Sequence, residues 1–380
     1  MNSRPILLVT NDLGPRAGGI ESFILGLLGE LDGSQIVIYT STQEGCEEFD
    51  RQLERKHGLL IYRDKAKVLL PTPRVNRRIA KVMKEYSSEI IWYGAAAPLG
   101  WMAGYLRRYG AKRQVALTHG HEVWWSKVWP FSFAMRVITS HLDVITYLGE
   151  FTHTAMLPIL SEKVSTIRMA PGIATAHFSP GPKSAELIDN WELRNHRVII
   201  SVGRLVHRKG QDRLIEAMPA ILREIPDAIL VLIGEGPRRA FLEKLVSKYQ
   251  LQEKVRFVGR VQYADLPSYL RLGDIFAMPS RSRFFGLEVE GLGIVYLEAS
   301  STGIPILGST IGGAPDAVLD GETGVVVDGA NIEAIATAAI SLLNNPQQRR
   351  EMGRRGREWA VEAWSWKLWG ERFSAILFGE

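Results

Sequence analysis

Two glutamates separated by an apolar, glycine-containing run are the first residues whose types and spacing suggest chemistry. Glu290 and Glu298 stand eight positions apart around the stretch GLGIVYL. The run predicts a helix from near 292 to about 302, with Gly303 and Pro305 as its stop. Positions eight apart differ by about 80° around an ideal helix, so the carboxylates do not form one stripe. We therefore expect Glu290 in the loop before the helix and Glu298 within it.

The start of this helix has the features of an anion site. The free N–H groups of Gly293, Ile294 and Val295 would point at an anion, plausibly a phosphate oxygen. A carboxylate in a helix that is apolar almost all round needs partners, and ribose hydroxyls would serve Glu298. Glu290 would then accept hydrogen bonds from a sugar ring. The alternative for Glu298, an ordinary helix glutamate paired to an arginine, is the better choice on this segment alone.

Two cations follow an earlier apolar run. In SVGRLVHRKGQDRL (201–214), Arg204 and Lys209 lie between a predicted strand and a predicted helix. A guanidinium can grip a phosphate in two places, and an ammonium acts as a point charge. Solvated surface cations are about equally probable on the pattern alone.

The loop after the first predicted strand, NDLGPRAGGIESF (11–23), contains Gly18 and Gly19. It lacks the G-x-G-x-x-G spacing, and the second strand ends in Tyr39 and Thr40 without an acidic residue, so an NAD site is disfavoured. The glycines either admit a ligand or merely open a helix, and the two readings carry similar weight.

A further loop, THGHEVWW (118–125), holds His119, His121 and Glu122 after a strand. A metal site is not supported, because no other His or Cys has suitable spacing and Cys46 is the single cysteine. A lone histidine is more often structural than catalytic, but the carboxyl end of a strand shifts the weight for His119 toward function.

Alternating apolar runs and helical patterns must position these residues. The expected strands are 6–10, 36–40, 90–94, 115–120, 143–149, 197–203, 228–236, 255–260, 275–280 and 305–309. Such alternation is typical of parallel sheets covered by helices. The Pro-, Gly- and polar-rich stretch 178–197 indicates an interdomain linker.

The chain of 380 residues is long enough for two domains. We predict an α/β protein with two doubly wound Rossmann-like domains, residues 1–180 and 197–364, and ligands bound in the cleft between them. A tryptophan-rich helix, 365–380, is expected to return to the first domain.

The distribution of charged and aromatic residues indicates what kind of partner the protein could bind. The segment 63–113 holds 12 Lys or Arg against 3 Asp or Glu, which favours anionic partners. Within it, 74–86 predicts a basic amphipathic helix, and 124–133 contains three tryptophans and two phenylalanines. Either feature could be ordinary packing, but together they favour contact with an anionic membrane surface. No run approaches the ~18 apolar residues of a spanning helix, and no groove-reading module supports nucleic-acid binding.

These motifs resemble the family 4 retaining glycosyltransferases, which have the GT-B fold of two Rossmann-like domains facing across a cleft. The resemblance is carried by GGI, THGHE, GRLVHRKGQD and EVEGLGIVYLEA and covers nearly the whole chain. It implies that Arg204 and Lys209 hold a donor pyrophosphate, that Glu298 binds ribose, and that Glu290 binds the transferred sugar. The backbone near Val261 would frame the base.

For the first domain the resemblance implies that Gly18 and Gly19 touch the donor phosphate and leave room for the acceptor, and that His119 contacts the donor sugar and supports catalysis. It implies no protein nucleophile. No metal cofactor is expected, because two cations and a helix end can stabilise the leaving diphosphate. One departure is Ala174, where the family commonly has Asp, which puts hinge contacts in doubt.

Among family 4 enzymes, the chain is similar to the phosphatidylinositol mannoside mannosyltransferases, with LPTPRV (70–75) and YGAAAPLG (93–100) in support. This implies mannose transfer from GDP-mannose to a phosphatidylinositol mannoside, with an α-(1-6) linkage, at the cytoplasmic face of the plasma membrane. Asp265 is a possible partner for guanine. Alternatives are another nucleotide-sugar enzyme, such as an epimerase or a transferase with a soluble acceptor, and a non-catalytic sugar-binding protein. The sequence does not indicate the oligomeric state.

Overall fold

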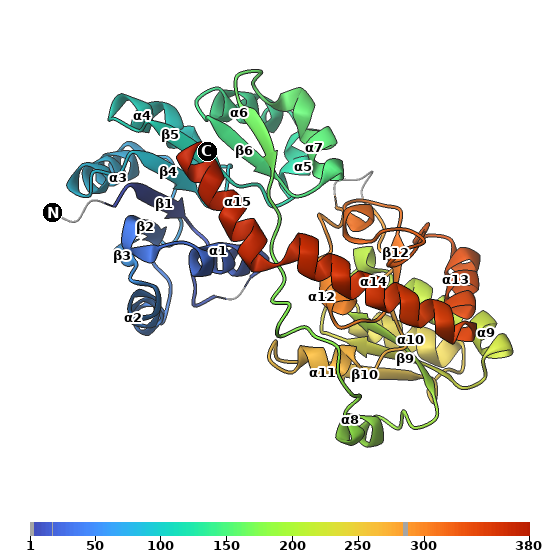
Figure 1. Cartoon of the computed structure of the whole chain (residues 1–380). Helices are drawn as coiled ribbons and strands as arrows, with labels where there is room; N and C mark the ends of the chain where they lie inside the picture. Colours follow the sequence, from blue (N-terminus) through green and yellow to red (C-terminus); the bar gives the residue numbers. More distant parts are fainter. Residues whose placement is uncertain (1–3, 17, 284–287) are drawn as a thin grey trace. The chain divides into compact units, whose positions relative to one another are not determined.

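The computed structural model describes three stretches of the chain, residues 4–16, 18–283 and 288–380 (Figure 1). The chain divides into two compact units. Unit 1 contains Met1–Gly172 together with Trp366–Glu380, and unit 2 contains Ile173–Ser365. The division thus falls after Gly172 and not at 180, and the stretch 178–197 belongs to unit 2.

Unit 1 is built on a sheet of parallel strands in the order β3-β2-β1-β4-β5-β6-β7. The strands are β1 (Ile6–Thr10), β2 (Ile36–Ser41), β3 (Leu60–Asp64), β4 (Ile90–Tyr93), β5 (Arg113–Ala116), β6 (Val144–Tyr147) and β7 (Ser165–Arg168). The order runs outward from β1 in both directions, as in a doubly wound sheet. Val9 lies opposite Tyr39 on one side and Tyr93 on the other. β1 and β2 are buried throughout, which explains their unbroken apolar runs.

Helices cover this sheet. They are α1 (Gly19–Glu30), α2 (Cys46–His57), α3 (Pro73–Glu85), α4 (Ala103–Arg108), α5 (Glu122–Trp125), α6 (Phe131–Thr139), α7 (Glu150–Met156) and α15 (Trp366–Phe378). The last of these, drawn in red in Figure 1, packs beside α1. Its Phe373 ring lies 4.8 Å from that of Trp92, and the Arg113 Nε donates a hydrogen bond to the Ile376 carbonyl at 2.7 Å. The C-terminal helix is therefore part of the core of unit 1.

Unit 2 repeats the architecture with the strand order β10-β9-β8-β11-β12-β13, again parallel. The strands are β8 (Arg197–Val202), β9 (Ala228–Ile233), β10 (Val255–Gly259), β11 (Ile275–Ala277), β12 (Ile306–Ser309) and β13 (Gly324–Val327). The helices are α8 (Ala185–Asn190), α9 (Gln211–Glu224), α10 (Arg239–Lys248), α11 (Leu266–Leu270), α12 (Ile294–Ser301), α13 (Ile332–Asn344) and α14 (Pro346–Trp364). The predicted linker thus contains a short helix, α8.

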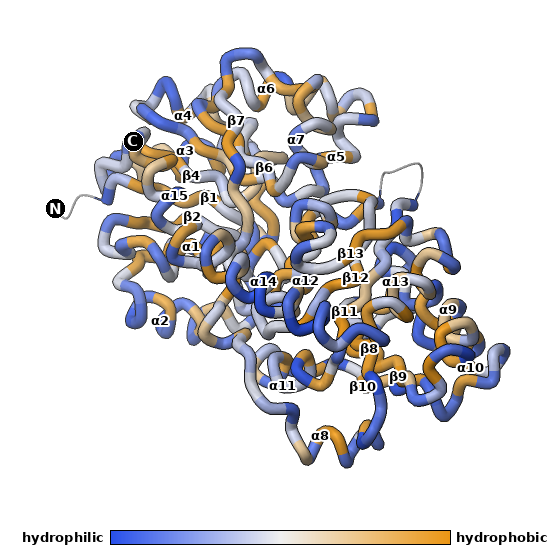
Figure 2. The backbone as a smooth tube through the Cα atoms, turned by 45° about the vertical axis from the view of Figure 1, so that its right-hand side comes forward, coloured by the Kyte–Doolittle hydropathy of each residue, from blue (hydrophilic) through white to orange (hydrophobic). Residues whose placement is uncertain are grey.

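Each unit has its own apolar core between sheet and helices. Figure 2 shows the contrast in hydropathy between the largely orange strands and the mostly blue α14. The prediction of two Rossmann-like domains is confirmed, and every predicted strand is present. Three strands, β3, β7 and β13, were not predicted; each lies at the edge of its sheet.

Candidate functional site

The loop after β8 in unit 2 carries the two predicted phosphate-binding cations in different environments. Gly203 has a φ of +151°, which favours glycine, and the chain then turns through Arg204 to a short 3₁₀ segment, His207–Lys209, before α9. The side chain of Arg204 is exposed, whereas Lys209 is only 8% exposed. The loop therefore offers one cation that is free to reach solvent and one that is buried.

The buried cation is paired with the first of the two glutamates. The Lys209 Nζ lies 2.9 Å from Glu290 Oε2, and Arg208 also donates to this oxygen. Burial by itself would raise the pKa of Glu290, but the charges of Lys209 and Arg208 hold that pKa below its usual value. Glu290 is thus ionised at neutral pH and lies in the loop before α12, as predicted. Arg208 was not predicted; its place next to Lys209 was the available signal.

The loop that holds Glu290 is fixed by a glycine turn that sequence reasoning missed. Gly313 donates its N–H to the Glu290 carbonyl at 2.9 Å. A Cβ on Gly313 would lie 2.0 Å from the Gly291 carbonyl oxygen, and one on Gly312 would lie 2.6 Å from that of Glu290. Neither position tolerates a side chain, so these glycines allow the two loops to pack backbone against backbone.

Helix α12 begins at Ile294, two positions later than predicted, with Gly293 as its N-cap. Gly293 has a φ of +79°, and a Cβ there would lie 2.6 Å from the ring of Tyr296. The first backbone bond of the helix runs from Tyr296 N to Gly293 O at 2.9 Å. The N–H groups of Ile294 and Val295 precede that bond, in the turn where a helix leaves its donors for other acceptors. These two N–H groups therefore lie four and five residues after Glu290 in the chain.

Glu298 lies inside α12 and is 9% exposed. Burial raises its pKa to about 7, and the charge of Lys209 offsets this in part. Two glutamates of one motif therefore have opposite environments, because Glu290 has cationic partners and Glu298 is mainly desolvated. Near neutral pH Glu298 is divided between its protonated and ionised forms.

A second layer of charges supports the loop that carries the cations. Asp212, near the start of α9, accepts a hydrogen bond from Arg281 at 2.5 Å and one from Arg238 at 3.3 Å. Arg281 also donates its backbone N–H to the Arg208 carbonyl at 2.9 Å. Sequence reasoning missed all three residues, because their partners are distant in the chain.

The residues predicted to frame the base follow β10. Gly259 ends the strand with a φ of +84°, and its carbonyl accepts the Gly234 N–H at 2.7 Å. Val261 is half-buried just beyond it. Asp265 has an exposed side chain and stands immediately before α11. Their contact with a base stays a prediction.

In unit 1 the two predicted glycines stand at the start of α1. Gly18 is the N-cap, its N–H is bonded to Glu21 Oε2 at 3.0 Å, and Gly19 is the first helical residue. The φ of Gly18 is −166°, which any residue can adopt, and a Cβ on either glycine would meet no heavy atom within 4 Å. Nothing within the described chain requires glycine here, so the open space beside them is suited to a ligand.

His119 follows β5 and is held by hydrogen bonds. Its ring Nε2 lies 2.6 Å from the Gly94 carbonyl, and its backbone N–H is bonded to Glu122 Oε2 at 2.9 Å. Because a carbonyl can only accept, Nε2 carries the proton. Burial lowers the pKa of His119, so the ring is neutral with Nδ1 available as an acceptor. Glu122 is fully buried and positions the loop, and His121 lies 3.4 Å from its other oxygen.

The predicted basic helix is observed as α3, but its apolar face is buried. Val75 and Ile79 pack in the core of unit 1, so this face is not available to lipid. Arg74 and Arg78 both pair with Asp64, which is buried in the sheet. The alternative of ordinary packing thus holds for the apolar face of α3, its charged face is exposed, and contact of that face with a membrane stays a prediction. Over residues 4–16, 18–283 and 288–380, no cluster of three His, Cys, Asp or Glu side chains could hold a metal ion.

Comparison with known proteins shows that the chain is similar to glycosyltransferases. The family model of glycosyl transferases group 1 matches residues 185–359. A GDP-mannose-dependent alpha-(1-6)-phosphatidylinositol monomannoside mannosyltransferase of Mycolicibacterium smegmatis is 40% identical over 98% of this chain and 98% of its own. A GDP-mannose-dependent monoacylated alpha-(1-6)-phosphatidylinositol monomannoside mannosyltransferase of Corynebacterium glutamicum is 38% identical over 100% of this chain and 99% of its own.

Solved structures resemble the chain along its length. Anabaena Alr3699/HepE in complex with UDP has a TM-score of 0.81 at 16% identity, covering 99% of this chain and 100% of that one. Sucrose-phosphate synthase of Thermosynechococcus elongatus has a TM-score of 0.76 at 21% identity, covering 99% and 98%. At these identities the likeness shows the fold alone, which is GT-B.

The raised pKa of Glu298 predicts a pH-dependent stability. The folded state binds this proton more tightly than the unfolded chain, so the contribution is fully present below the unfolded value of 4.5 and is lost as pH rises to about 7. Glu298→Gln removes the ionisation. Between pH 4.5 and pH 7.5, its free energy of unfolding relative to the wild type is expected to rise by up to about 3 kcal/mol.

Urea denaturation at a series of pH values measures this difference. Glu253→Gln, at an exposed position of unit 2, is the matched control and is expected to show no such rise. A difference between Glu298→Gln and wild type that stays constant across the range would contradict the assignment.

Proposed function

Because this chain belongs to the group 1 glycosyl transferases and has the GT-B fold, we propose that it transfers mannose from GDP-mannose to a phosphatidylinositol mannoside with an α-(1-6) linkage. The main support is identity of 38–40% to such mannosyltransferases along essentially the whole chain. The arrangement of Lys209, Glu290 and Glu298 around the start of α12 is what a nucleotide-sugar donor requires.

The donor diphosphate is assigned to the cations and amides of unit 2. The exposed side chain of Arg204 can rotate to bind a phosphate. The ammonium of Lys209 contacts the phosphate as well as the Glu290 carboxylate, so its ion pair with Glu290 becomes weaker. The N–H groups of Gly293, Ile294 and Val295 supply further donors with the favourable helix dipole. These groups stabilise the leaving diphosphate as its negative charge grows during bond cleavage.

Glutamates on either side of the diphosphate orient the sugars. The ionised form of Glu298 accepts hydrogen bonds from the ribose hydroxyls, and Glu290 accepts hydrogen bonds from the hydroxyls of mannose. In unit 1, His119 is proposed to contact the donor sugar, with Nδ1 as an acceptor, and Gly18 and Gly19 to lie against the donor phosphate. No protein nucleophile is proposed for this retaining reaction.

Removal of the two donor cations tests the donor assignment. In the double variant Arg204→Met with Lys209→Met, two charge-assisted contacts of about 1.5–3 kcal/mol each are lost, so GDP is expected to bind at least about 100-fold more weakly. Isothermal titration with GDP measures binding, and transfer of radiolabel from GDP-mannose to organic-soluble lipid measures activity. Lys244→Met with Lys248→Met, both exposed on α10, is the charge-matched control.

The outcomes of that assay separate the alternatives. Organic-soluble label supports transfer to lipid. Label that moves to water-soluble acceptors indicates a different acceptor, conversion of the free nucleotide sugar indicates an epimerase, and binding without turnover indicates a sugar-binding protein. Unchanged GDP affinity in the double variant would overturn the donor site.

We propose that the reaction needs no metal ion, because cations and a helix end surround the diphosphate. Mannosyl transfer is therefore expected to keep its full rate when EDTA is added to the assay. Loss of activity on chelation that Mg²⁺ restores would contradict this expectation.

We also propose peripheral association with an anionic membrane. None of the helices in the described ranges is long and apolar enough to cross a bilayer. Support comes from the charged face of α3, where Arg77, Lys81 and Lys84 are exposed, and from Trp129 and Phe133, which are 81% and 60% exposed. A cytoplasmic leaflet rich in anionic phospholipid would provide both the surface and the acceptor.

Charge reversal on α3 tests the membrane proposal. Each cation near an anionic surface contributes about 1 kcal/mol, so Arg77→Glu with Lys81→Glu is expected to weaken binding to vesicles containing phosphatidylinositol by about 30-fold or more. Co-sedimentation at fixed salt measures this. Lys244→Glu with Lys248→Glu on α10 makes the same charge change and is expected to bind nearly as wild type. Equal loss in both variants would show a non-specific charge effect.

A further inference from the structure

Unit 1 contains a large pocket at the carboxyl ends of β1 and β2, here called the polar pocket because several ionisable side chains line it. Its volume is about 1170 Å³, and its walls include Gly18 and Gly19. Ionisable side chains of both signs line it, among them Asp12, Arg16, Glu21, Glu44 and Lys67. Carboxylates accept hydrogen bonds from hydroxyls, and cations hold phosphates. The pocket therefore suits a phosphorylated polyol.

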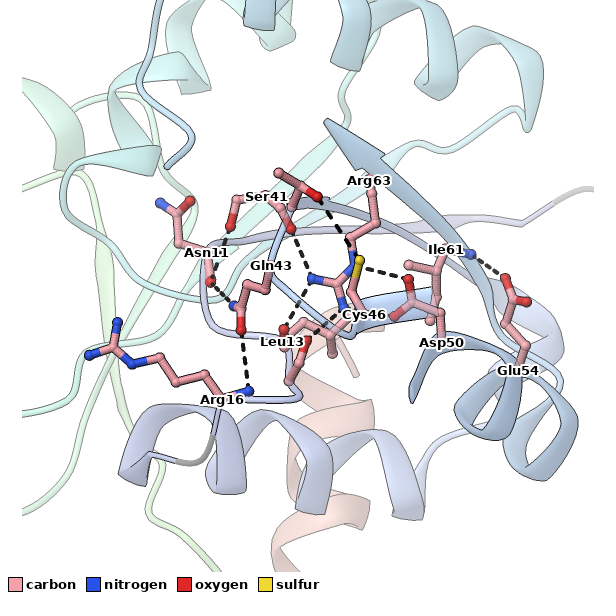
Figure 3. Close-up of polar contacts among 12 residues, drawn as sticks. Asn11, Leu13, Arg16, Ser41, Gln43, Cys46, Asp50, Glu54, Ile61 and Arg63 are labelled. Atoms are coloured by element: carbon pink, nitrogen blue, oxygen red, sulfur yellow. Dashed lines mark hydrogen bonds and ion pairs between the residues drawn. The ribbon is translucent and has the colours of Figure 1, made fainter. Parts of the chain in front are cut away.

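Hydrogen bonds and ion pairs tie together the segments next to this polar pocket, as Figure 3 shows. Arg63 donates to the carbonyls of Leu13 at 3.2 Å, Gly14 at 2.7 Å and Ser41 at 2.8 Å, and its remaining donors bind the Asp50 carboxylate. The guanidinium thus binds the loop after β1 at Leu13 and Gly14, the end of β2 at Ser41, and α2 at Asp50. The loop that carries the lining residue Asp12 is therefore tied to β2, α2 and β3.

One chain segment, Lys67–Pro71, connects the polar pocket to a second pocket. Lys67 and Val68 line the polar pocket. Leu69 is buried, and its N–H and carbonyl are both bonded to the side chain of Asn11, at 2.6 and 3.1 Å. Pro71 lines the second pocket. Four residues of chain reach at most about 14 Å, so the pockets are close neighbours.

The second pocket is apolar throughout. It has a volume of about 350 Å³ and is lined only by proline, aromatic and aliphatic residues, including Trp101, Trp125, Phe131 and Phe133. The Phe131 ring lies 5.0 Å from that of Trp125, so the walls are packed together. Trp101 is nevertheless 48% exposed and Phe133 60% exposed. Large aromatic side chains exposed around a concave site mark a place where an apolar group binds.

We infer that this apolar pocket binds one acyl chain of the lipid acceptor while the phosphorylated headgroup occupies the polar pocket. This inference rests on the proposed function and specifies how its acceptor is recognised. The chemistry of the two pockets matches the two ends of one amphiphile. Arg16 and Lys67 complement its phosphate, and Lys67 and Pro71, one from each pocket, lie within about 14 Å of each other, a distance that one lipid molecule can span. A lipid that is extracted from the bilayer in this way gains affinity from its chain even when no membrane is present.

The test uses water-soluble acceptors, so that membrane binding plays no part. The wild type is assayed with dihexanoyl phosphatidylinositol monomannoside below its critical micelle concentration and with the deacylated glycerophospho form. Burial of two methylenes corresponds to a factor of about ten, so the KM for the dihexanoyl acceptor is expected to be at least about tenfold lower. In Phe133→Ser and in Trp101→Ser, the ratio of the two KM values is expected to fall toward one.

Trp129→Ser is the matched control. Trp129 is 81% exposed and does not line the apolar pocket, so its loss is expected to weaken vesicle binding but keep the KM ratio. Equal KM values for the two acceptors in the wild type would overturn the acyl-chain assignment. A stable dimer that Phe133→Ser dissociates would also overturn it, because a second copy would then cover this face.

A binding measurement separates this inference from the proposed reaction. Bromine quenches tryptophan fluorescence at short range, so the 5,6-dibromohexanoyl acceptor is expected to quench the wild type more than Trp101→Phe, with no GDP-mannose present. Quenching without mannosyl transfer would retain the pocket and refute the reaction. Transfer without any difference in quenching between the two proteins would refute the pocket and retain the reaction.

Discussion

The organisation of unit 2 depends on a charge pair that is largely withdrawn from water, Lys209 with Glu290. A buried ammonium or carboxylate is costly without its partner, so the loop after β8 and the loop before α12 are held together. Arg208 adds a second cation to the same carboxylate, and the turn at Gly312 and Gly313 brings the backbone close enough for this pairing. The result is a cluster of positive charge beside the start of α12. In the ligand-free protein the Glu290 carboxylate neutralises part of this charge, and a bound phosphate would compete with it for Lys209.

Much of the fold could be predicted from sequence, because strands buried on both faces need continuous apolar runs. β1 and β8 are such strands. β3, β7 and β13 each lie at a sheet edge and are only partly buried. β3 and β7 mix polar and apolar residues, and β13 is a short run of only four residues, GVVV, so none of them gives the long apolar signal of a central strand. The helix α8 was missed because it packs few apolar residues and buries none. The division between units falls earlier than predicted, because the chain after Gly172 already packs in unit 2: Phe178 is buried, and its carbonyl accepts a hydrogen bond from Ser301 Oγ at 2.6 Å.

For the candidate site, sequence indicated the residues with local signatures, such as Glu298 within an apolar helix and Lys209 before a helix start. It could not indicate partners that only folding brings together. Asp212 meets Arg281 across 69 positions, and Asn11 meets Leu69 across 58. The helical spacing of residues in α3 correctly predicted which positions lie on its apolar face and which on its charged face. It could not show that the apolar face packs in the core, or that Asp64 forms ion pairs with two of the arginines.

The position of α15 determines the order in which the chain can finish folding during synthesis. Phe373 and its neighbours fill the space over Trp92, yet they leave the ribosome only after every residue of unit 2. Unit 2 is a continuous segment and can reach its final packing first. The first sheet to be made, with its buried aromatic surface, therefore waits uncovered for the last helix, and nascent chains stalled before 366 expose that surface to chaperones.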